Sequence, residues 1–297
     1  MLYFFIVNGR TDFNQRIKND LDRQLAGLQI YHKIYTTTGI GDGTRFVRLY
    51  CDLHPHKEVC FVACGGSGMV NEVASGIINE ENKYMAVLAY GTTNDFIKYY
   101  PDLDFTSFDK ILKGEIHKID SIRVNDNYAV NVCNFGFDSI VASEANYQAE
   151  QGNSKPYLRG IIKAIFTGRY NKIRVSADGK RLNRRRMLLC TLANGKYVGG
   201  EFLCAPNAVN DDGLIELCLL KPMLLLSFLR LMPIYKDGKH LAADSKLKSK
   251  IIYRRVKHVD IESKNLIEVC LDGEMLPGTS FSVDILPSSV NFILPEK

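Results

Sequence analysis

The chain of 297 residues is 46% apolar and 24% charged, so it can bury a substantial core and does not have the composition of a disordered protein. Its 38 basic and 33 acidic side chains give a net charge of +5, which favours anionic partners such as nucleotides or an acidic membrane face without requiring them. Eight cysteines without a C-x-x-C pair argue against a zinc site and predict free thiols in a reducing cytosol.

The first part of the chain alternates short apolar strands with helical segments, the pattern of a parallel α/β sheet. Met1 to Val7 is too short for a signal peptide and is expected to form the first strand. Cys60 and Cys64 have the even spacing that places two residues on one face of a strand. The predicted strands are Leu2 to Val7, Gln29 to Tyr35, Glu58 to Cys64 and Met85 to Ala89, and the predicted helices are Asp12 to Leu25, Thr44 to Tyr50 and Met69 to Asn79.

From about Ile116 the pattern changes to alternating strands separated by turn signals, which predicts a second, antiparallel domain. The predicted strands are Ile116 to Val124, Tyr128 to Cys133, Lys172 to Ser176, Met187 to Ala193, Leu214 to Leu220 and Leu266 to Leu271, with helical stretches near Phe137 to Gln148 and Pro156 to Phe166. The most apolar stretch, Met223 to Ile234, contains Arg230 and Pro233 and lacks the ~20 residues that cross a bilayer.

The most informative motif is Ala-Cys-Gly-Gly-Ser-Gly-Met-Val-Asn-Glu-Val at residues 63–73, where a strand leads through glycines into a helix. Gly65, Gly66 and Gly68 lack a Cβ atom, so backbone amides at the helix start could approach an anion closely. Asn71 and Glu72 open the helix. A tight strand-to-helix turn without any ligand is the alternative interpretation.

A second junction of the same kind, Ala-Tyr-Gly-Thr-Thr-Asn-Asp-Phe, follows the next strand at residues 89–96. Loops at the carboxyl ends of neighbouring parallel strands face one crevice, so both loops could contact one ligand. The side chains of Thr92, Thr93, Asn94 and Asp95 offer groups suited to a triphosphate and its Mg²⁺. Helix capping by Thr93, Asn94 or Asp95 would explain the same residues.

Common nucleotide fingerprints are absent: there is no P-loop and no protein-kinase signature, and Asn71 stands where G-x-G-x-x-G requires glycine. The chain instead resembles the diacylglycerol kinase catalytic-domain family of bacterial lipid kinases and sphingosine kinases, distant relatives of NAD kinases. Members look like G-G-D-G-T-x-N-E-V, then G-T-x-N-D-F, then D-G-E. This chain has residues 65–73, 91–96 and 272–274 in the same order, and the similarity spans nearly its whole length.

The resemblance implies an N-terminal parallel-sheet nucleotide-binding domain, like that of NAD and diacylglycerol kinases, followed by a β-rich antiparallel sandwich domain. It places the first domain at residues 1–122, with about 287–297 returning to it, and the second at 123–286, contributing the lipid side and the D-G-E motif. The implied activity is transfer of the γ-phosphate of ATP, with Mg²⁺, to a hydroxyl of a lipid such as diacylglycerol.

The same resemblance implies a set of site residues. Glu274 would be the general base, with Asp272, Asp95 and Asp120 as further catalytic acidic residues. The nucleotide would be held by Thr37, Gly65, Gly66, Ser67, Gly68, Met69, Asn71, Glu72, Gly91, Thr92 and Asn94. A structural Mg²⁺ would be bound in the loop 205–214 by the side chain of Asp212 and the carbonyls of Val209 and Leu214, although Asp-Asp-Gly alone is usually a turn.

Ser67 and Met69 depart from the family pattern, which has aspartate and threonine at these positions. Serine contributes no charge for holding Mg²⁺, and methionine loses a hydroxyl. A catalytically impaired nucleotide-binding protein that acts as sensor or scaffold therefore stays open as an alternative to an active lipid kinase. The distant resemblance to NAD kinases leaves a second alternative open, a kinase with a soluble nucleotide-like acceptor.

Three basic clusters occur in the second half of the chain, at 184–186, 246–250 and 254–258. Such charge runs are usually solvated, and no nucleic-acid-binding module accompanies them. The apolar stretch Leu224 to Met232, followed by Lys236, Lys239 and later lysines, could instead rest on anionic lipid. The expected partners are ATP and a lipid substrate at a membrane surface, with no nucleic acid; a homodimer stays open. The expected location is the cytoplasm, including the inner membrane face.

Overall fold

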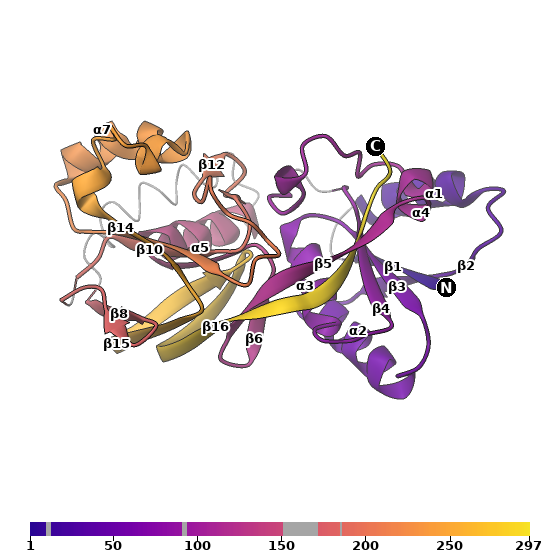
Figure 1. The fold of residues 1–297 in the computed structure, drawn as a ribbon. Helices are drawn as coiled ribbons and strands as arrows, with labels where there is room; N and C mark the ends of the chain where they lie inside the picture. Colours follow the sequence, from indigo (N-terminus) through magenta and orange to yellow (C-terminus); the bar gives the residue numbers. More distant parts are fainter. Residues whose placement is uncertain (10–12, 91–93, 151–171, 185) are drawn as a thin grey trace. The chain divides into compact units, whose positions relative to one another are not determined.

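The computed structural model describes residues 1–297 except 10–12, 91–93, 151–171 and 185 (Figure 1). The chain divides into two compact units: Met1–Ser121 with Pro287–Lys297 form unit 1, and Ile122–Leu286 form unit 2. Unit 1 contains a parallel sheet with helices and unit 2 is rich in antiparallel strands, which confirms the predicted fold class. The helix predicted at Pro156 to Phe166 lies outside the described residues.

Unit 1 is built on a parallel sheet in the order β2-β1-β3-β4. The end of β16 (Glu274–Leu294) joins this sheet in parallel, pairing Phe292 with Met85. The amide of Asn291 donates to the carbonyls of Glu80, Glu81 and Lys83 and so ties this last strand to the start of β4. The elements are β1 (Leu2–Asn8), α1 (Phe13–Leu25), β2 (Tyr31–Thr37), α2 (Asp42–Leu53), β3 (Val59–Cys64), α3 (Ser67–Gly76), β4 (Lys83–Leu88), η1 (Ile97–Tyr99) and α4 (Phe108–Leu112).

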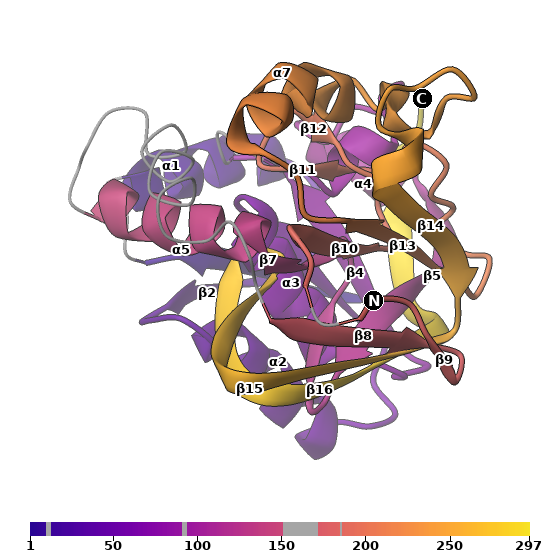
Figure 2. The same ribbon diagram turned by 90° about the vertical axis from the view of Figure 1, so that its left-hand side faces the viewer.

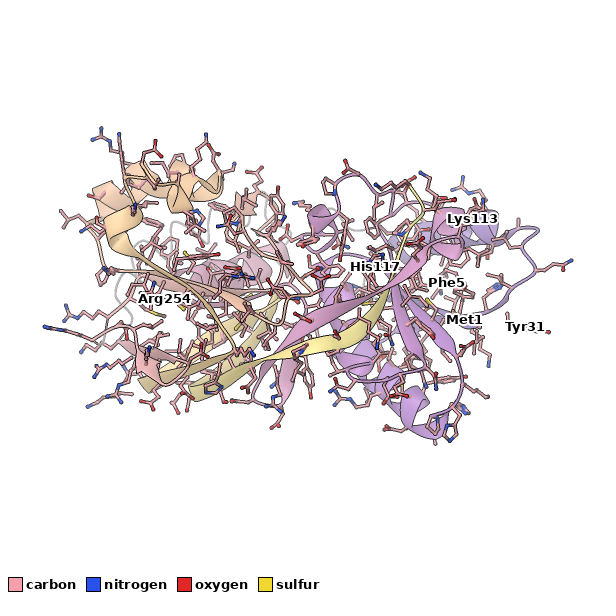
Figure 3. All side chains as sticks on the ribbon, in the orientation of Figure 1. Met1, Phe5, Tyr31, Lys113, His117 and Arg254 are labelled. Atoms are coloured by element: carbon pink, nitrogen blue, oxygen red, sulfur yellow. The ribbon has the colours of Figure 1, made fainter. Side chains whose placement is uncertain are left out.

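Helices cover both faces of this sheet. Successive side chains of β1 and β3 point to opposite sides, so each face has its own packed core. Tyr3, Phe5, Val7, Cys60 and Cys64 belong to one core cluster with residues of α1 and α4. Cys60 and Cys64 therefore share a buried face, as their spacing predicts. Phe4 lies on the other side, where its ring contacts Phe46 and Tyr50 of α2. Figure 3 labels two residues of this sheet: Phe5, which is fully buried, and Tyr31 on the edge strand β2, which is 83% exposed.

Unit 2 is built on an antiparallel sheet in the order β14-β13-β10-β7-β15-β16. The strands are β5 (Glu115–Val124), which begins in unit 1, β6 (Asn127–Ala129), β7 (Val132–Gly136), β8 (Ile173–Ala177), β9 (Lys180–Arg181), β10 (Leu189–Ala193), β11 (Tyr197–Val198), β12 (Phe202–Leu203), β13 (Ile215–Leu220), β14 (Ile251–Val256) and β15 (His258–Leu271). The helices are α5 (Phe137–Glu150) and α7 (Leu225–Lys236), and the short turns are η2 (Lys239–Leu241) and η3 (Lys248–Lys250).

The central strands of unit 2 are buried on both faces. Cys190 and Leu192 of β10 belong to one core cluster, and Leu189 and Ala193 belong to a second cluster that includes Phe137 of α5. Figure 2 shows α5 along one face of this sheet, where it contacts β7 and β15. Double-sided burial explains why these strands are nearly continuous apolar runs in the sequence.

Several strands of unit 2 differ from the sequence prediction. The strand predicted from Tyr128 to Cys133 is broken into β6 and β7, since the side chain of Asp272 binds the amides of residues 130–132 in place of a ladder partner. β14 was not predicted, because Arg254 and Arg255 resemble a solvated charge run. β15 begins at His258 rather than near Leu266.

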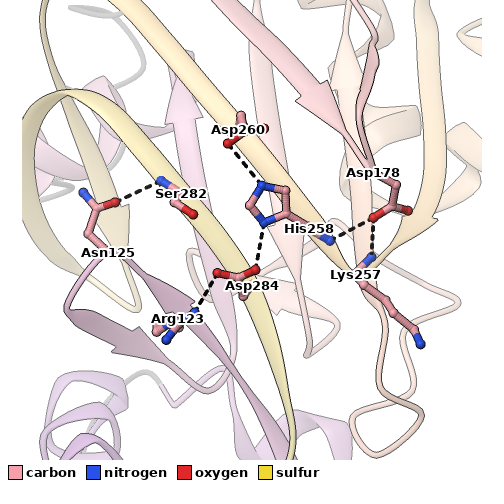
Figure 4. A network of polar contacts seen from close by, with 8 residues as sticks. All are labelled: Arg123, Asn125, Asp178, Lys257, His258, Asp260, Ser282 and Asp284. Atoms are coloured by element: carbon pink, nitrogen blue, oxygen red, sulfur yellow. Dashed lines mark hydrogen bonds and ion pairs between the residues drawn. The ribbon is translucent and has the colours of Figure 1, made fainter.

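A polar network on the surface of unit 2 joins β15, β16 and the end of β5 (Figure 4). His258 Nδ1 lies 2.7 Å from Asp284 Oδ1, and its Nε2 lies 3.1 Å from Asp260 Oδ1. Arg123 completes the network by pairing with Asp284 at 3.0 Å. The hydrogen bond to Asp284 raises the pKa of His258, because the neighbouring carboxylates favour the charged ring.

Eight cysteines lie among the described residues, all buried, and none forms a disulfide. In the parts of the chain that the structure describes, no helix combines the length and the apolar composition that crossing a bilayer requires.

Candidate functional site

The loops that follow the parallel strands of unit 1 meet at the carboxyl edge of the sheet. The amide of Gly9, after β1, donates to Thr37 Oγ1 at the end of β2 over 3.4 Å. The amide of Asp95 donates to Ser67 Oγ over 3.1 Å, and Asn94 Nδ2 donates to the carbonyl of Gly65 over 3.4 Å. The loops after β3 and β4 are thus hydrogen-bonded to each other, as expected for two segments that face one ligand.

The glycine turn after β3 leads directly into the first turn of α3. Gly66 is the N-cap with an extended backbone, and the amide of Val70 makes the first intrahelical bond to its carbonyl at 3.2 Å. No side chain of the described residues caps this helix, so the amides of Ser67, Gly68 and Met69 are available to an anion. A Cβ atom added at Gly68 would meet nothing within 4 Å, so space is open beside this turn.

Two other residues of this motif have packing roles. A Cβ atom at Gly65 would lie 3.0 Å from Cβ of Met69, so glycine allows that side chain to pack closely against the turn. Met69 itself is buried at 7% exposure. Met69 therefore contributes its side chain to the packing of the turn, and any contact that it makes with a ligand would come from its backbone amide.

Glu72 links α3 to the loop before α2. Its carboxylate accepts the amides of Gly41 at 3.1 Å and Gly43 at 2.7 Å, and its carbonyl accepts the hydroxyl of Thr44 at 2.9 Å. The side chain was predicted to hold nucleotide, but its oxygens are engaged with the N-terminus of α2, where a negative charge is favourable. Glu72 thus positions the loop after β2 relative to the glycine turn.

Asp42 orders the loop after β2 and was not identified from the sequence. One of its carboxylate oxygens accepts the amide and hydroxyl of Thr38 and the hydroxyl of Tyr35, and the other pairs with Arg45 at 2.5 Å. The hydrogen bond from the Thr38 amide is the main reason that the pKa of Asp42 falls to about 2. One sequence signal could have identified Asp42: it directly follows Thr-Gly-Ile-Gly, at the start of a helix.

Two buried amide oxygens in this site have no partner among the described residues: Oδ1 of Asn71 and Oδ1 of Asn94. Buried polar atoms normally have a hydrogen-bond partner, so an orphaned pair marks a place that a ligand or ion could complete. The carboxylate of Asp95 lies in the same loop as Asn94 and pairs with Lys98 at 3.0 Å. Oxygen donors of this kind fit Mg²⁺, although no cluster of three His, Cys, Asp or Glu side chains in the described residues could hold a metal alone.

The chain after β4 is anchored to α1. The hydroxyl of Tyr90 donates to Asp20 at 2.7 Å, and the amide of Gln24 bridges Tyr90 to the carbonyl of Thr106. Burial raises the pKa of Tyr90, so its hydroxyl remains a donor. The predicted site residues Gly91 and Thr92, like Thr93, lie outside the described residues.

Asp120 lies on β5 in unit 1 and is fully buried. Its Oδ1 accepts the amide of Ser288 at 2.7 Å, immediately before the last strand crosses into the parallel sheet. The next residue, Ser121, shares a hydrogen bond of 2.7 Å with Ser289. These contacts give Asp120 a structural role in returning β16 to unit 1.

Asp272 and Gly273 form the two-residue turn between β15 and β16 in unit 2, with φ angles of 49° and 101°. Two such residues are typical of a tight β-hairpin. The carboxylate of Asp272 accepts the amides of Val130 at 2.8 Å, Asn131 at 3.1 Å and Val132 at 2.7 Å. Asp272 therefore anchors the chain before β7, while Glu274, half-buried, is the first residue of β16.

The loop predicted to bind a structural Mg²⁺ also lies in unit 2. Oδ1 of Asp212 accepts the amide of Leu214 at 3.0 Å, and Oδ2 pairs with the guanidinium of Arg255. Arg255 also pairs with the buried Glu216 at 3.0 Å, and Val209 is 39% exposed. Both carboxylate oxygens thus have partners within the chain, and a cation bound at Oδ2 of Asp212 would compete with the guanidinium of Arg255.

Comparison with known proteins places these features in a family. Residues 3–124 match the diacylglycerol kinase catalytic domain, and residues 131–294 match the YegS C-terminal NAD kinase beta sandwich-like domain. A diacylglycerol kinase of Bacillus subtilis (strain 168) is 28% identical, with 92% of this chain and 89% of that protein covered. A "Probable lipid kinase YegS-like" of Serratia proteamaculans (strain 568) is 25% identical, with 98% and 93% covered.

Solved structures show the same fold. A crystal structure from Bacillus anthracis str. Sterne, assigned as a diacylglycerol kinase, has a TM-score of 0.76 at 23% identity and covers 98% of this chain and 96% of its own. An NAD kinase from Archaeoglobus fulgidus in complex with ATP has a TM-score of 0.54 at 11% identity, covering 100% and 95%. The chain therefore belongs to the diacylglycerol kinase family of lipid kinases, with the catalytic domain followed by the YegS-type C-terminal domain.

Proposed function

We propose that the protein is an ATP- and Mg²⁺-dependent lipid kinase that transfers the γ-phosphate of ATP to a hydroxyl of a lipid acceptor such as diacylglycerol. The observation that carries this proposal is the pair of hydrogen-bonded loops in unit 1, where the uncapped start of α3 lies against Asn94 and Asp95. Family membership supports phosphoryl transfer and a lipid acceptor. The relative solved with bound ATP supports this nucleotide as the donor.

The amides of Ser67, Gly68 and Met69 are our candidates for holding the phosphates, because they carry the partial positive charge of the helix start. Thr37 lies at the end of β2, at the same edge of the sheet, and is our candidate for the adenosine side. Ser67 also holds the loop after β4 through its hydroxyl. A neutral serine thus retains a positioning role at a place where the family pattern has aspartate.

Mg²⁺, when bound, would neutralise part of the charge on the transferred phosphoryl group. Asn71, Asn94 and Asp95 are the residues of the described site that would hold it. Their oxygens are buried or adjacent to the glycine turn, as a hard cation beside a polyphosphate requires.

Glu274 is our candidate for the general base. Its carboxylate would take the proton of the lipid hydroxyl as that oxygen forms a bond to the γ-phosphorus, while the bond from phosphorus to the β-phosphate bridging oxygen breaks and ADP leaves. The tight turn at Asp272 and Gly273 fixes the start of β16, so it also fixes the backbone of Glu274.

The test measures label from γ-phosphate-labelled ATP in extracted lipid, with diacylglycerol in mixed micelles as acceptor. Glu274→Gln should lower kcat about a hundredfold or more. Glu268→Gln is the matched control, because Glu268 lies on the partner strand of the same hairpin and is exposed.

Three outcomes would contradict the proposal. Label in a water-soluble product other than ATP and inorganic phosphate would identify a soluble acceptor instead. Tight ATP binding without transfer would favour a catalytically impaired homologue. Equal rates for Glu274→Gln and wild type would remove Glu274 from the reaction.

A further inference from the structure

Unit 2 carries a hollow beside the start of α7 that the reaction proposed above does not use. Its volume is about 430 Å³, within the usual range for small-molecule sites. Four of the lining residues are apolar, and two lysines contribute to the lining from the chain segment around η3. The lining residues are Pro222, Met223, Leu224, Ser227, Leu231, Lys246 and Lys250.

One strongly exposed leucine lines this hollow: Leu224, the N-cap of α7, is 74% exposed. Met223 and Phe228 fix the segment to unit 2, because both belong to its buried core. An exposed leucine beside an apolar hollow, held on a firmly packed helix, is a feature of surfaces that contact other apolar material.

The charged side chains that line the hollow are two lysines. No carboxylate is among the residues that line it, and Lys246 and Lys250 are both exposed. The sequence pattern favoured Lys236 and Lys239 as the lipid-facing lysines. The structure pairs these two with Glu201 and Asp237, which lowers the net charge that they contribute.

We propose that this hollow, with Leu224 and the lysines Lys246 and Lys250, is the surface by which the protein docks on an anionic phospholipid bilayer. Leu224 would enter the boundary between headgroups and acyl chains, and the two ammonium groups would contact lipid phosphates. Two lysines without a carboxylate in the lining, beside four apolar lining residues, fit a membrane of this kind better than a protein partner with mixed charges. The proposal rests on the proposed function, since a lipid kinase must reach an acceptor that resides in a membrane.

The experiment measures binding of the full chain to sedimented vesicles, without ATP. Vesicles of phosphatidylcholine alone are compared with vesicles that contain phosphatidylglycerol. Each lysine near an anionic surface contributes about 1 kcal/mol, so replacing both by alanine should weaken binding about 25-fold on anionic vesicles. Lys180→Ala with Lys264→Ala is the control of equal charge change, because both lysines are exposed in unit 2 away from this segment of the chain.

Leu224→Ser separates the apolar contribution from the charge. It should weaken binding to anionic vesicles at high salt as well as at low salt, whereas the effect of the lysine pair should fade as salt increases. Equal loss in the control pair, or unchanged binding in both test variants, would overturn the proposal. Competition by millimolar inorganic phosphate, with no vesicle binding, would identify a free-phosphate site and would also overturn it.

Kinase activity on a short-chain diacylglycerol in detergent micelles separates the two proposals. If the lysine variant keeps wild-type activity in micelles and loses it on vesicles, docking is confirmed as a separate step. If wild type transfers no phosphate in either format but binds vesicles through this surface, the lipid kinase proposal fails while the docking surface stands.

Discussion

Replacing Asp272 by alanine should destabilise unit 2, because its carboxylate binds three consecutive backbone amides. Hydrogen bonds to a charged acceptor contribute about 1.5–3 kcal/mol each, and the alanine variant would leave these buried donors without a partner. The contributions are not additive, and the turn borders solvent, so we expect a loss of about 4 kcal/mol. For a domain of this size, that corresponds to a decrease in Tm of about 8–16 °C.

The assay is thermal unfolding followed by circular dichroism, beside the phosphate-transfer assay. Asp126→Ala is the control, since Asp126 is an exposed aspartate in another turn of unit 2 and should change stability by less than about 0.5 kcal/mol. Glu274→Gln should lose activity at an unchanged Tm. If Asp272→Ala also loses activity while its Tm stays within about 2 °C of wild type, Asp272 acts in the reaction and the structural role assigned to it is wrong.

Three further predictions concern other residues. Ser67→Asp combined with Met69→Thr should raise kcat in the transfer assay, because the new carboxylate adds charge for Mg²⁺; a lower kcat at unchanged Tm would contradict this. Burial lowers the pKa of His240 from 6.5 to about 4, so the neutral ring stabilises the fold fully above pH 6.5 and this contribution is lost as pH falls toward 4. The decrease in unfolding free energy, about 3 kcal/mol, should be absent in His240→Phe when denaturant midpoints are compared across this pH range. Mg²⁺ should not raise the Tm of wild type through the loop at Asp212, because Arg255 pairs with that carboxylate. In Arg255→Ala, Mg²⁺ should raise the Tm. Equal responses of the two proteins to Mg²⁺ would refute the assignment of Arg255 as the partner of Asp212.

The parallel half of the fold was predictable because β1, β3 and β4 are short apolar runs that alternate with helical segments. β1 and β3 end within one or two residues of their predicted limits, since Asn8 and Gly65 follow the last apolar residues. The antiparallel half was less predictable. β14 has Arg254 and Arg255 exposed at a sheet edge, and only its pairing with β13 makes that segment a strand.

The candidate site was predictable as a set of loops but not as a set of contacts. Parallel strand order requires that the loops at Gly65 and Asn94 meet. No sequence pattern shows that Glu72 binds amides at the start of α2, or that Asp272 binds the chain before β7, because these partners are distant in sequence. An acidic residue in such a motif is therefore easily assigned to catalysis from the sequence. In the structure, Glu72 and Asp272 bind backbone amides.

The central claim is that the start of α3 holds the phosphates of ATP, and calorimetric titration of ATP with Mg²⁺ into wild type and Gly68→Ala tests it most directly. Space is open at Gly68 and alanine favours helix, so the variant should keep or raise its Tm. Its added methyl group would occupy the space beside the amides, and loss of one charge-assisted contact should weaken ATP binding about tenfold or more. Equal affinity in the two proteins, or no heat of binding from wild type, would contradict the claim.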